Sequence, residues 1–170
     1  KFINLTEGNL EKARVVDIDL NEKFSLGRTN ETSVFTLDHS SFIKKFSESF
    51  TKYFSLKTKD LTSFQVLKYS KSQHYSQHFD AYSEKTLSNR GKSQRLFTFI
   101  IYLNDDFLGG HTAFPLLDIS IEPKRGSLLA FQNCFEGTEY AHPKSLHTSI
   151  PVQEGIKWAL LFWSKENLVL

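Results

Sequence analysis

The stretch SLHTSIPVQEGIKWALLFW, residues 145–163, predicts two β-strands joined by the turn Val152-Gln153-Glu154-Gly155. The returning strand, residues 156–163, is apolar on both faces apart from Lys157. Side chains two residues apart share a face of a strand, so Lys157 lies beside three apolar residues, namely Ala159, Leu161 and Trp163. Burying an ammonium group without a partner is costly. Lys157 therefore either meets an anion inside the fold or lies on an outer face with its ammonium reaching solvent.

Further short strands precede this pair and are separated by turn-rich segments. They are FQVLKYS (64–70), YSQHFD (75–80), RLFTFIIYL (95–103), LLDISI (116–121) and SLLAFQ (127–132), and SLHTSI (145–150) is the first strand of the pair itself. Several strands at such spacing are typical of a β-sandwich or barrel. The 16 Phe residues favour an aromatic β interior over a leucine-rich helical bundle.

The N-terminal third has a different pattern. Between His39 and Phe54, apolar residues recur at three- and four-residue steps, which predicts an amphipathic helix with Asp38 as its N-cap. Residues 13–20 predict a strand, and residues 21–34 and 81–94 predict mobile loops. Together, the predicted helix and the series of short strands indicate an α+β protein: a double-stranded β-helix (jelly-roll) barrel supported by an N-terminal helix or helices. No repeat or linker divides the chain, so we expect a single domain over residues 1–170.

Composition excludes several classes of protein. The chain has 21 Lys and Arg against 19 Asp and Glu, and no basic run interleaved with aromatic residues, which argues against nucleic acid as a partner. No stretch approaches the roughly 20 apolar residues that a membrane helix needs. Cys134 is the only cysteine, so no internal disulfide can form. We expect a soluble domain, with an intracellular location slightly favoured. Because the chain begins at Lys1 and contains no Met, we also expect that its native N-terminus has been removed.

The tripeptide His78-Phe79-Asp80 ends one predicted strand. Its histidine and aspartate project from the same face and can reach one ion. Two histidines and one carboxylate on one face of an octahedron, with three positions open, are typical of non-heme Fe(II) oxygenases. Alone, His-x-Asp is weak evidence, since a surface histidine beside a solvated aspartate gives the same pattern. The block from His147 to Trp163 strengthens it, because a dicarboxylate could chelate iron at one end and meet Lys157 at the other.

Four segments carry a resemblance to a known family: VLKYSKSQHYSQHFD (66–80), RLFTFIIYLNDDFLGGHTAFP (95–115), IEPKRGSLLAFQN (121–133) and SLHTSIPVQEGIKWALLFW (145–163). In these the chain resembles the prolyl 4-hydroxylase family of Fe(II)/2-oxoglutarate-dependent dioxygenases. Residues 13–30 resemble, more faintly, the segment that leads into the family's peptide-covering loop.

The resemblance implies roles for ten residues. The iron ligands would be His78, Asp80 and His147, and 2-oxoglutarate would be bound by Tyr69, Thr112 and Lys157. The substrate groove would be lined by Arg28, Tyr75, Arg95 and Trp163. His142 is the rival for the distal iron ligand, but His147 has the family's spacing to Lys157. Without the resemblance, Tyr69 and Tyr75 could be ordinary strand aromatics, Arg95 a solvated charge and Trp163 a core residue.

The activity implied is hydroxylation of prolyl residues in a peptide or protein, with Fe(II) as cofactor, 2-oxoglutarate and O2 as co-substrates, and ascorbate as a candidate reductant. The chain departs from the family at two positions. Lys165 stands where many members have histidine, which leaves the exact substrate open. His111 stands where many have glutamate and places an extra imidazole near the site, at its rim rather than as a metal ligand. The alternatives are an oxygenase acting on another protein residue or a small molecule, and a non-catalytic jelly-roll binding module. A nucleic-acid demethylase is disfavoured by the near-neutral charge.

Overall fold

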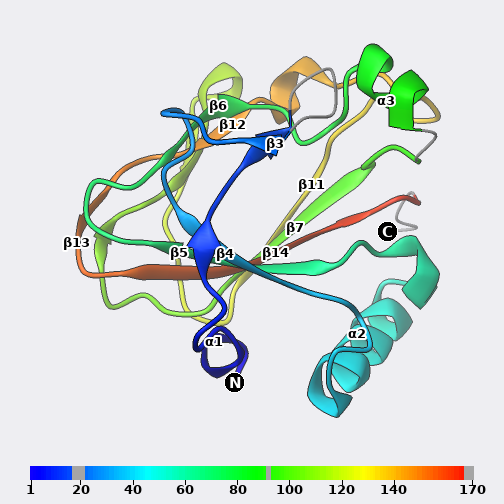
Figure 1. Ribbon diagram of the computed structural model, residues 1–170. Helices are drawn as coiled ribbons and strands as arrows, with labels where there is room; N and C mark the ends of the chain where they lie inside the picture. The colour runs from blue at the N-terminus through cyan, green and yellow to red at the C-terminus, as the bar shows by residue number, and fades with distance from the viewer. Residues whose placement is uncertain (17–21, 91–92, 167–170) are drawn as a thin grey trace.

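The computed structural model describes residues 1–16, 22–90 and 93–166 and is dominated by two antiparallel sheets (Figure 1). In order across the first sheet, the strands are β1 (Glu11–Lys12), β4 (Glu31–Phe35), β5 (Phe64–Tyr69), β14 (Lys157–Ser164), β7 (Phe97–Tyr102) and β11 (Leu128–Gln132). In the second they are β10 (Ile119–Ile121), β9 (Thr112–Phe114), β12 (His147–Ser149) and β6 (Tyr75–His78). Two smaller pairs join β13 (Val152–Glu154) to β8 (Leu108–Gly109), and β2 (Val15–Val16) to β3 (Glu22–Lys23).

The helical segments are short except for one. They are α1 (Phe2–Leu5), α2 (Ser41–Tyr53), α3 (Glu84–Arg90) and the 3-10 turns η1 (Thr58–Asp60), η2 (Pro115–Leu117) and η3 (Pro143–Ser145). Among the described residues, no helix is both long and apolar enough to cross a membrane. The mixed α and β jelly-roll-type fold predicted from the sequence is confirmed, although in the described part of the chain the two sheets are not joined into a closed barrel.

Strand β14 separates two clusters of buried side chains, as its sequence predicts. On one face, Leu160 and Phe162 pack in a cluster with α2, where the Phe50 ring meets the edges of Phe99 and Phe162 with ring centroids 4.9 Å apart. On the other face, Ala159, Leu161 and Trp163 join a cluster that includes Tyr69 and Tyr102. Figure 1 shows α2 on one side of the large sheet and β6 and β12 on the other. The second face is therefore the one enclosed between the sheets.

Helix α2 confirms the predicted helix, but its N-cap differs from the prediction. The Oγ of Ser40 accepts a hydrogen bond from the backbone N–H of Ile43 at 3.2 Å, so Ser40, and not Asp38, caps the helix. A serine hydroxyl one residue before the first helical turn satisfies a backbone donor that would otherwise lack a partner.

Both predicted loops contain regular structure. The first loop contains β3 and most of β4. Strand β4 forms there because it pairs with β5, and the side chains of Ser33 and Phe35 are buried while that of Val34 is exposed. In the second, residues 84–90 form α3, whose first turn is satisfied by the Ser83 hydroxyl accepting from the Thr86 N–H. Residues 21, 91 and 92 of these loops lie outside the described residues, as do residues 17–20 of the strand predicted over 13–20.

Two smaller predictions were wrong in their boundaries. The expected turn at 152–155 is largely strand β13, which pairs with β8, so that the chain turns at Gly155 with a φ of 79°. The strand predicted over 116–121 begins only at Ile119. Pro115 starts the 3-10 turn η2 before it, and Asp118 is left-handed with a φ of 55°.

Candidate metal and co-substrate site

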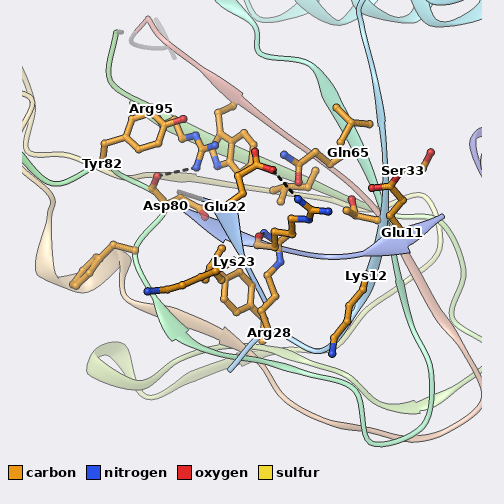
Figure 2. Close-up of a pocket in the computed structure, with 18 of the residues that line it drawn as sticks. Glu11, Lys12, Glu22, Lys23, Arg28, Ser33, Gln65, Asp80, Tyr82 and Arg95 are labelled. Carbon is orange, nitrogen blue, oxygen red and sulfur yellow. Dashed lines mark hydrogen bonds and ion pairs between the residues drawn. The ribbon is translucent and has the colours of Figure 1, made fainter. Parts of the chain in front are cut away.

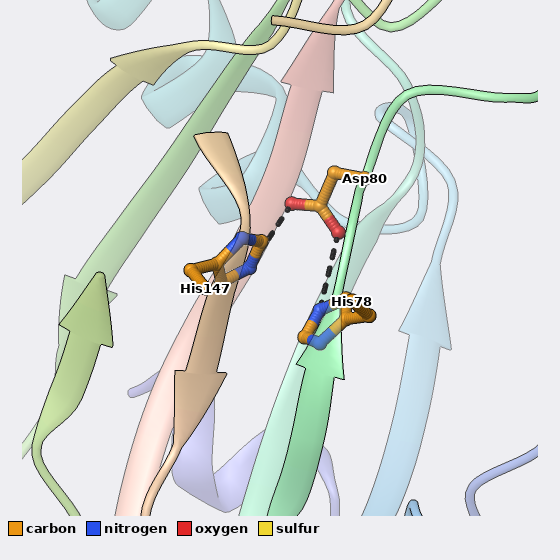
Figure 3. Close-up of side chains that lie close together, drawn as sticks. All are labelled: His78, Asp80 and His147. Atoms are coloured by element: carbon orange, nitrogen blue, oxygen red, sulfur yellow. Dashed lines mark ion pairs between the residues drawn. The ribbon is translucent and has the colours of Figure 1, made fainter. Parts of the chain in front are cut away.

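His78, Asp80 and His147 come together where β6 and β12 lie side by side (Figure 3). The two histidines are partners in the strand register, and their ring centroids are 4.2 Å apart. Their Nε2 atoms lie 3.5 Å (His78) and 3.7 Å (His147) from the two carboxylate oxygens of Asp80. One potential ligand atom from each side chain lies within 4.8 Å of the others. The structure thus gathers the three residues in a geometry that fits one metal ion.

Backbone carbonyls fix the orientation of both imidazoles. His78 Nδ1 lies 2.8 Å from the carbonyl oxygen of Ser76, and His147 Nδ1 lies 2.9 Å from that of Ser145. A carbonyl can only accept, so each Nδ1 carries the proton and donates it. This leaves each Nε2, on the side of Asp80, as the ring nitrogen that could bind a metal.

The charges of the triad also suit a metal. Burial alone would raise the pKa of the Asp80 carboxyl, but the neighbouring His147, His78 and Arg95 outweigh it and hold that pKa well below its usual range. Burial lowers the pKa of the His147 imidazole. The site therefore offers a carboxylate at Asp80, and burial favours the neutral, metal-binding form of His147. This N2O donor set fits non-heme iron better than a closed structural zinc site, which takes four protein ligands.

Lys157 begins β14 and is only 3% exposed. Its Nζ donates to the carbonyl oxygen of Gly110 at 2.6 Å and to the hydroxyl of Ser149 at 3.1 Å. Burial lowers the pKa of the Lys157 ammonium to about 7, and no carboxylate of the described residues contributes to that shift. The ammonium thus lies inside the fold among neutral acceptors, as expected for a group that receives an anion.

Tyrosines surround this lysine. Tyr69 is its partner across the strand pair β5–β14, and the Lys157 Nζ lies 5.1 Å from the Tyr69 ring centroid and 5.5 Å from that of Tyr102. The Tyr102 hydroxyl donates to the Thr112 hydroxyl at 2.8 Å. Burial raises the pKa of both tyrosines to about 12, so their hydroxyls stay protonated. The three residues that the resemblance linked to 2-oxoglutarate, Tyr69, Thr112 and Lys157, are thus buried around one spot.

Sequence reasoning missed two residues of the buried cluster around Lys157, Tyr102 and Ser149. Ser149 lies two residues after His147 on the same strand, and Tyr102 lies on the strand next to β14. The period-two rule could have identified Ser149, because it shares a face with His147. Nothing in the local sequence distinguishes Tyr102 from an ordinary strand aromatic.

A groove of about 1220 Å³ opens beside the triad and is lined by Arg28, Tyr75, Asp80, Tyr82, Arg95 and Trp163, among others (Figure 2). The Arg95 guanidinium lies 3.6 Å from the Trp163 ring centroid and 4.4 Å from that of Tyr82, and it donates to the Asp80 carbonyl oxygen at 3.4 Å. All four residues that the resemblance assigned to the substrate groove line this groove. Tyr82 is a further lining residue that sequence reasoning missed.

His142, His111 and Cys134 have contacts other than with the triad. His142 accepts a hydrogen bond from the Lys144 N–H and packs against the Phe135 ring, so the geometry favours His147 over this rival. His111 Nδ1 lies 3.3 Å from the Ser120 hydroxyl. Burial raises the pKa of the Cys134 thiol to about 11, consistent with an unreactive cysteine. The side chain of Lys165 is exposed.

Comparison with known proteins defines the class. Residues 64–165 match the family described as the 2OG-Fe(II) oxygenase superfamily, which is more than half of the chain, and the chain belongs to that superfamily. Fe(II), 2-oxoglutarate and O2, predicted from the sequence as cofactor and co-substrates, are those of the superfamily. Ascorbate stays a prediction.

Particular relatives are prolyl 4-hydroxylases, which confirms the resemblance. A putative prolyl 4-hydroxylase of Acanthamoeba polyphaga mimivirus is 33% identical over 81% of this chain and 59% of its own length. Prolyl 4-hydroxylase 2 of Arabidopsis thaliana is 29% identical over 95% of this chain and 61% of its own length. The chain thus spans about three fifths of the length of these relatives.

Solved structures give the same fold. The viral collagen prolyl hydroxylase of Paramecium Bursaria Chlorella virus-1, in complex with 2-oxoglutarate, has a TM-score of 0.68 and 27% identity over 80% of this chain and 78% of its own. A Trichoplax adhaerens prolyl hydroxylase, in complex with a hypoxia inducible factor peptide, has a TM-score of 0.69. At 19% identity over 95% of this chain and 73% of its own, the latter supports the fold alone.

Proposed function

We propose that residues 1–170 form one Fe(II)- and 2-oxoglutarate-dependent dioxygenase domain that hydroxylates prolyl residues in a peptide or protein. The observation that carries the proposal is the pairing of the His78, Asp80 and His147 triad with a buried Lys157 on the same enclosed side of β14. In this proposal the triad holds the iron. When bound, iron supplies the oxidative chemistry: O2 and 2-oxoglutarate are converted to succinate and CO2, and one oxygen atom enters a substrate C–H bond.

Lys157 and its neighbours would orient 2-oxoglutarate. The ammonium would pair with the carboxylate far from the metal, in a pocket where the charge-assisted hydrogen bond is shielded from water. The residues Tyr69, Thr112 and Ser149 are buried around Lys157, and their hydroxyls can donate to carboxylate oxygens. Burial of these groups would keep the co-substrate in one orientation, with its keto-acid end toward the triad.

The groove would hold the peptide. The indole Nε1 of Trp163 is buried and has no hydrogen-bond partner among the described residues, while Trp163 lines the groove and is 4% exposed. A buried N–H without an acceptor is costly, and a peptide carbonyl would supply one. Tyr75 would place the prolyl ring beside the metal, because its own ring lies against His78. Arg95, stacked on Trp163, would add a positive charge to the wall of the groove.

The covering segment favours a peptide over a small molecule. Residues Ser25–Thr29 run beside β6, where the Gly27 carbonyl accepts from the Ser76 N–H at 2.7 Å and the His74 carbonyl from the Thr29 N–H at 3.0 Å. Arg28 from this segment lies over the Tyr75 ring, 4.8 Å from its centroid. A groove of about 1220 Å³ that is walled in part by Arg28 of this segment has room for a peptide chain.

The cellular location is a separate question, and an intracellular location remains a prediction from the sequence.

A substrate screen tests the proposal. The purified chain would be loaded with Fe(II) without oxygen, then incubated with 2-oxoglutarate, ascorbate, O2 and short proline-rich peptides, with alanine replacing proline in control peptides. We expect a gain of one oxygen atom on the proline peptides alone, with one succinate released per hydroxylation. Turnover confined to free amino acids or other small molecules would refute the peptide substrate. A chain that binds metal but never releases succinate would be the non-catalytic binding module.

A further inference from the structure

Behind the triad, a chain of buried hydrogen bonds runs through Thr98 on β7 and Asn133, which directly follows β11. Both residues are 0% exposed. The Thr98 hydroxyl lies 2.7 Å from Asp80 Oδ2, and Asn133 Nδ2 lies 2.8 Å from Thr98 Oγ1. We propose that Thr98 and Asn133 are positioning residues that hold Asp80 as a one-oxygen ligand and tie it to His147. The inference rests on the metal site of the proposed function.

The direction of these hydrogen bonds follows from counting protons. Thr98 has one hydroxyl proton and two acceptors in reach, Asp80 Oδ2 at 2.7 Å and Asn133 Oδ1 at 3.1 Å. The carboxylate is charged and nearer, so it receives the proton. The Asn133 amide can then only donate to Thr98, which completes a one-way chain from Asn133 through Thr98 to Asp80.

This chain engages one oxygen of the ligand. With Oδ2 accepting from Thr98, Oδ1 is the oxygen left without that bond, and it lies 3.5 Å from His78 Nε2. Two imidazoles and a single carboxylate oxygen leave three of six octahedral positions open. A metal held in this way would have room for both a keto-acid and O2. A carboxylate that bound through both oxygens would remove one of the three, so the hydroxyl of Thr98 would preserve the vacancy that the reaction needs.

Asn133 also reaches the second ligand. Its backbone carbonyl accepts from the Ser145 hydroxyl at 3.2 Å, and the Ser145 carbonyl accepts from His147 Nδ1 at 2.9 Å. The same Asn133 backbone is fixed from both sides, since its N–H donates to the Leu96 carbonyl and its carbonyl accepts from the His142 N–H, each at 2.8 Å. One buried asparagine thus links the carboxylate and the distal imidazole.

The network could instead serve only to satisfy buried polar groups, and metal affinity separates the two roles. The test compares the wild type with Thr98→Val, which removes the hydroxyl at equal size, and Thr98→Ser, which keeps it. Thr51→Val is the matched control, because Thr51 is a buried threonine in α2 whose hydroxyl donates to the Ser47 carbonyl. Anaerobic titration with Co(II) and with Fe(II) gives the dissociation constants, and the visible spectrum of bound Co(II) reports its coordination number.

We expect Thr98→Val to bind both metals about 10- to 100-fold more weakly, the range found for partners of metal ligands. Its Co(II) spectrum should also differ from that of the wild type. Thr98→Ser and Thr51→Val should keep the wild-type affinity and spectrum. If Thr98→Val does not fold, Asn133→Asp takes its place, because an acceptor at this position competes with Asp80 for the Thr98 proton.

Two results would overturn the inference, and they can be told apart. Wild-type affinity and spectrum in Thr98→Val, or in Asn133→Asp if that variant is used, would show a merely structural network while the proposed function stands. A wild-type chain that binds neither Co(II) nor Fe(II) would refute the metal site, and the inference with it.

Discussion

The ring of Tyr75 lies flat against the imidazole of His78, with centroids 3.5 Å apart and planes inclined by 14°. Arg28 of the covering segment lies 4.8 Å from the centroid of the same tyrosine ring. One side chain thus contacts both a proposed iron ligand and the covering segment. The ring of Tyr75 contacts His78, and Tyr75 also lines the groove. One substitution that removes the ring and another that removes only the hydroxyl can therefore separate the role in metal binding from the role in peptide binding.

Tyr75→Leu should weaken Co(II) binding by about 2- to 13-fold, because an aromatic pair contributes about 0.5–1.5 kcal/mol. Tyr75→Phe keeps the ring and should keep the metal affinity, while raising the KM for the peptide. Anaerobic metal titrations and peptide kinetics on both variants give the two numbers. Equal metal affinity in the leucine and phenylalanine variants would show that the stack does not orient His78.

The buried ammonium predicts a pH dependence for 2-oxoglutarate binding. Burial lowers the pKa of Lys157 to about 7, so above that pH the free chain holds a neutral amine. A bound carboxylate favours the charged form and raises this pKa, so binding above pH 7 takes up a proton. The affinity should therefore be constant just below pH 7 and fall as the pH rises above it.

Calorimetry in buffers of different ionisation heats measures that proton uptake on the anaerobic Fe(II)-loaded chain. Lys157→Met, of similar length, should abolish the uptake and weaken binding about 10- to 100-fold, the value of a hydrogen bond to a charged group. Unchanged proton uptake in the methionine variant would assign the titration to another group.

Gly110 should tolerate no side chain. It has a φ of 65°, its carbonyl accepts from Lys157, and an added Cβ would lie 3.1 Å from Lys157 Cδ, from the Phe107 ring and from Val152. Gly110→Ala should lower both stability and 2-oxoglutarate affinity.

Gly126→Ala is the control, because Gly126 has a φ of 82° but nothing within 4 Å of an added Cβ. It should cost about 1–2 kcal/mol of stability from the left-handed backbone alone and leave co-substrate affinity unchanged. Equal affinities in the two variants would argue against the pocket at Lys157.

Trp163→Phe removes the buried indole N–H and keeps an aromatic ring under Arg95. If a peptide carbonyl accepts from this N–H, the KM for peptide should rise about 5- to 10-fold, from the net value of one hydrogen bond. The KM for 2-oxoglutarate should not move. Steady-state kinetics with each substrate varied in turn provides the check, and a change in the 2-oxoglutarate KM alone would place Trp163 outside the peptide groove.

Much of the site could be predicted because it follows short-range rules. The two-residue period of a strand places His78 with Asp80, and it places Lys157 on the enclosed face of β14. Long-range pairing explains what was missed. Thr98 and Asn133 are far apart in sequence from Asp80, and no local pattern shows that their side chains meet it. Strand β4 was missed for the same reason, since its polar residues are held by pairing with β5.

The most direct test of the central claim is the fate of heavy-isotope O2 during turnover of a proline peptide. The triad at His147 predicts one labelled oxygen atom in the peptide and one in succinate for each turnover. His147→Ala should abolish both, while His142→Ala, which alters a histidine outside the triad, should retain both. Labelled peptide from His147→Ala, or peptide that stays unlabelled with the wild type while succinate carries the label, would contradict a prolyl hydroxylase built on this triad.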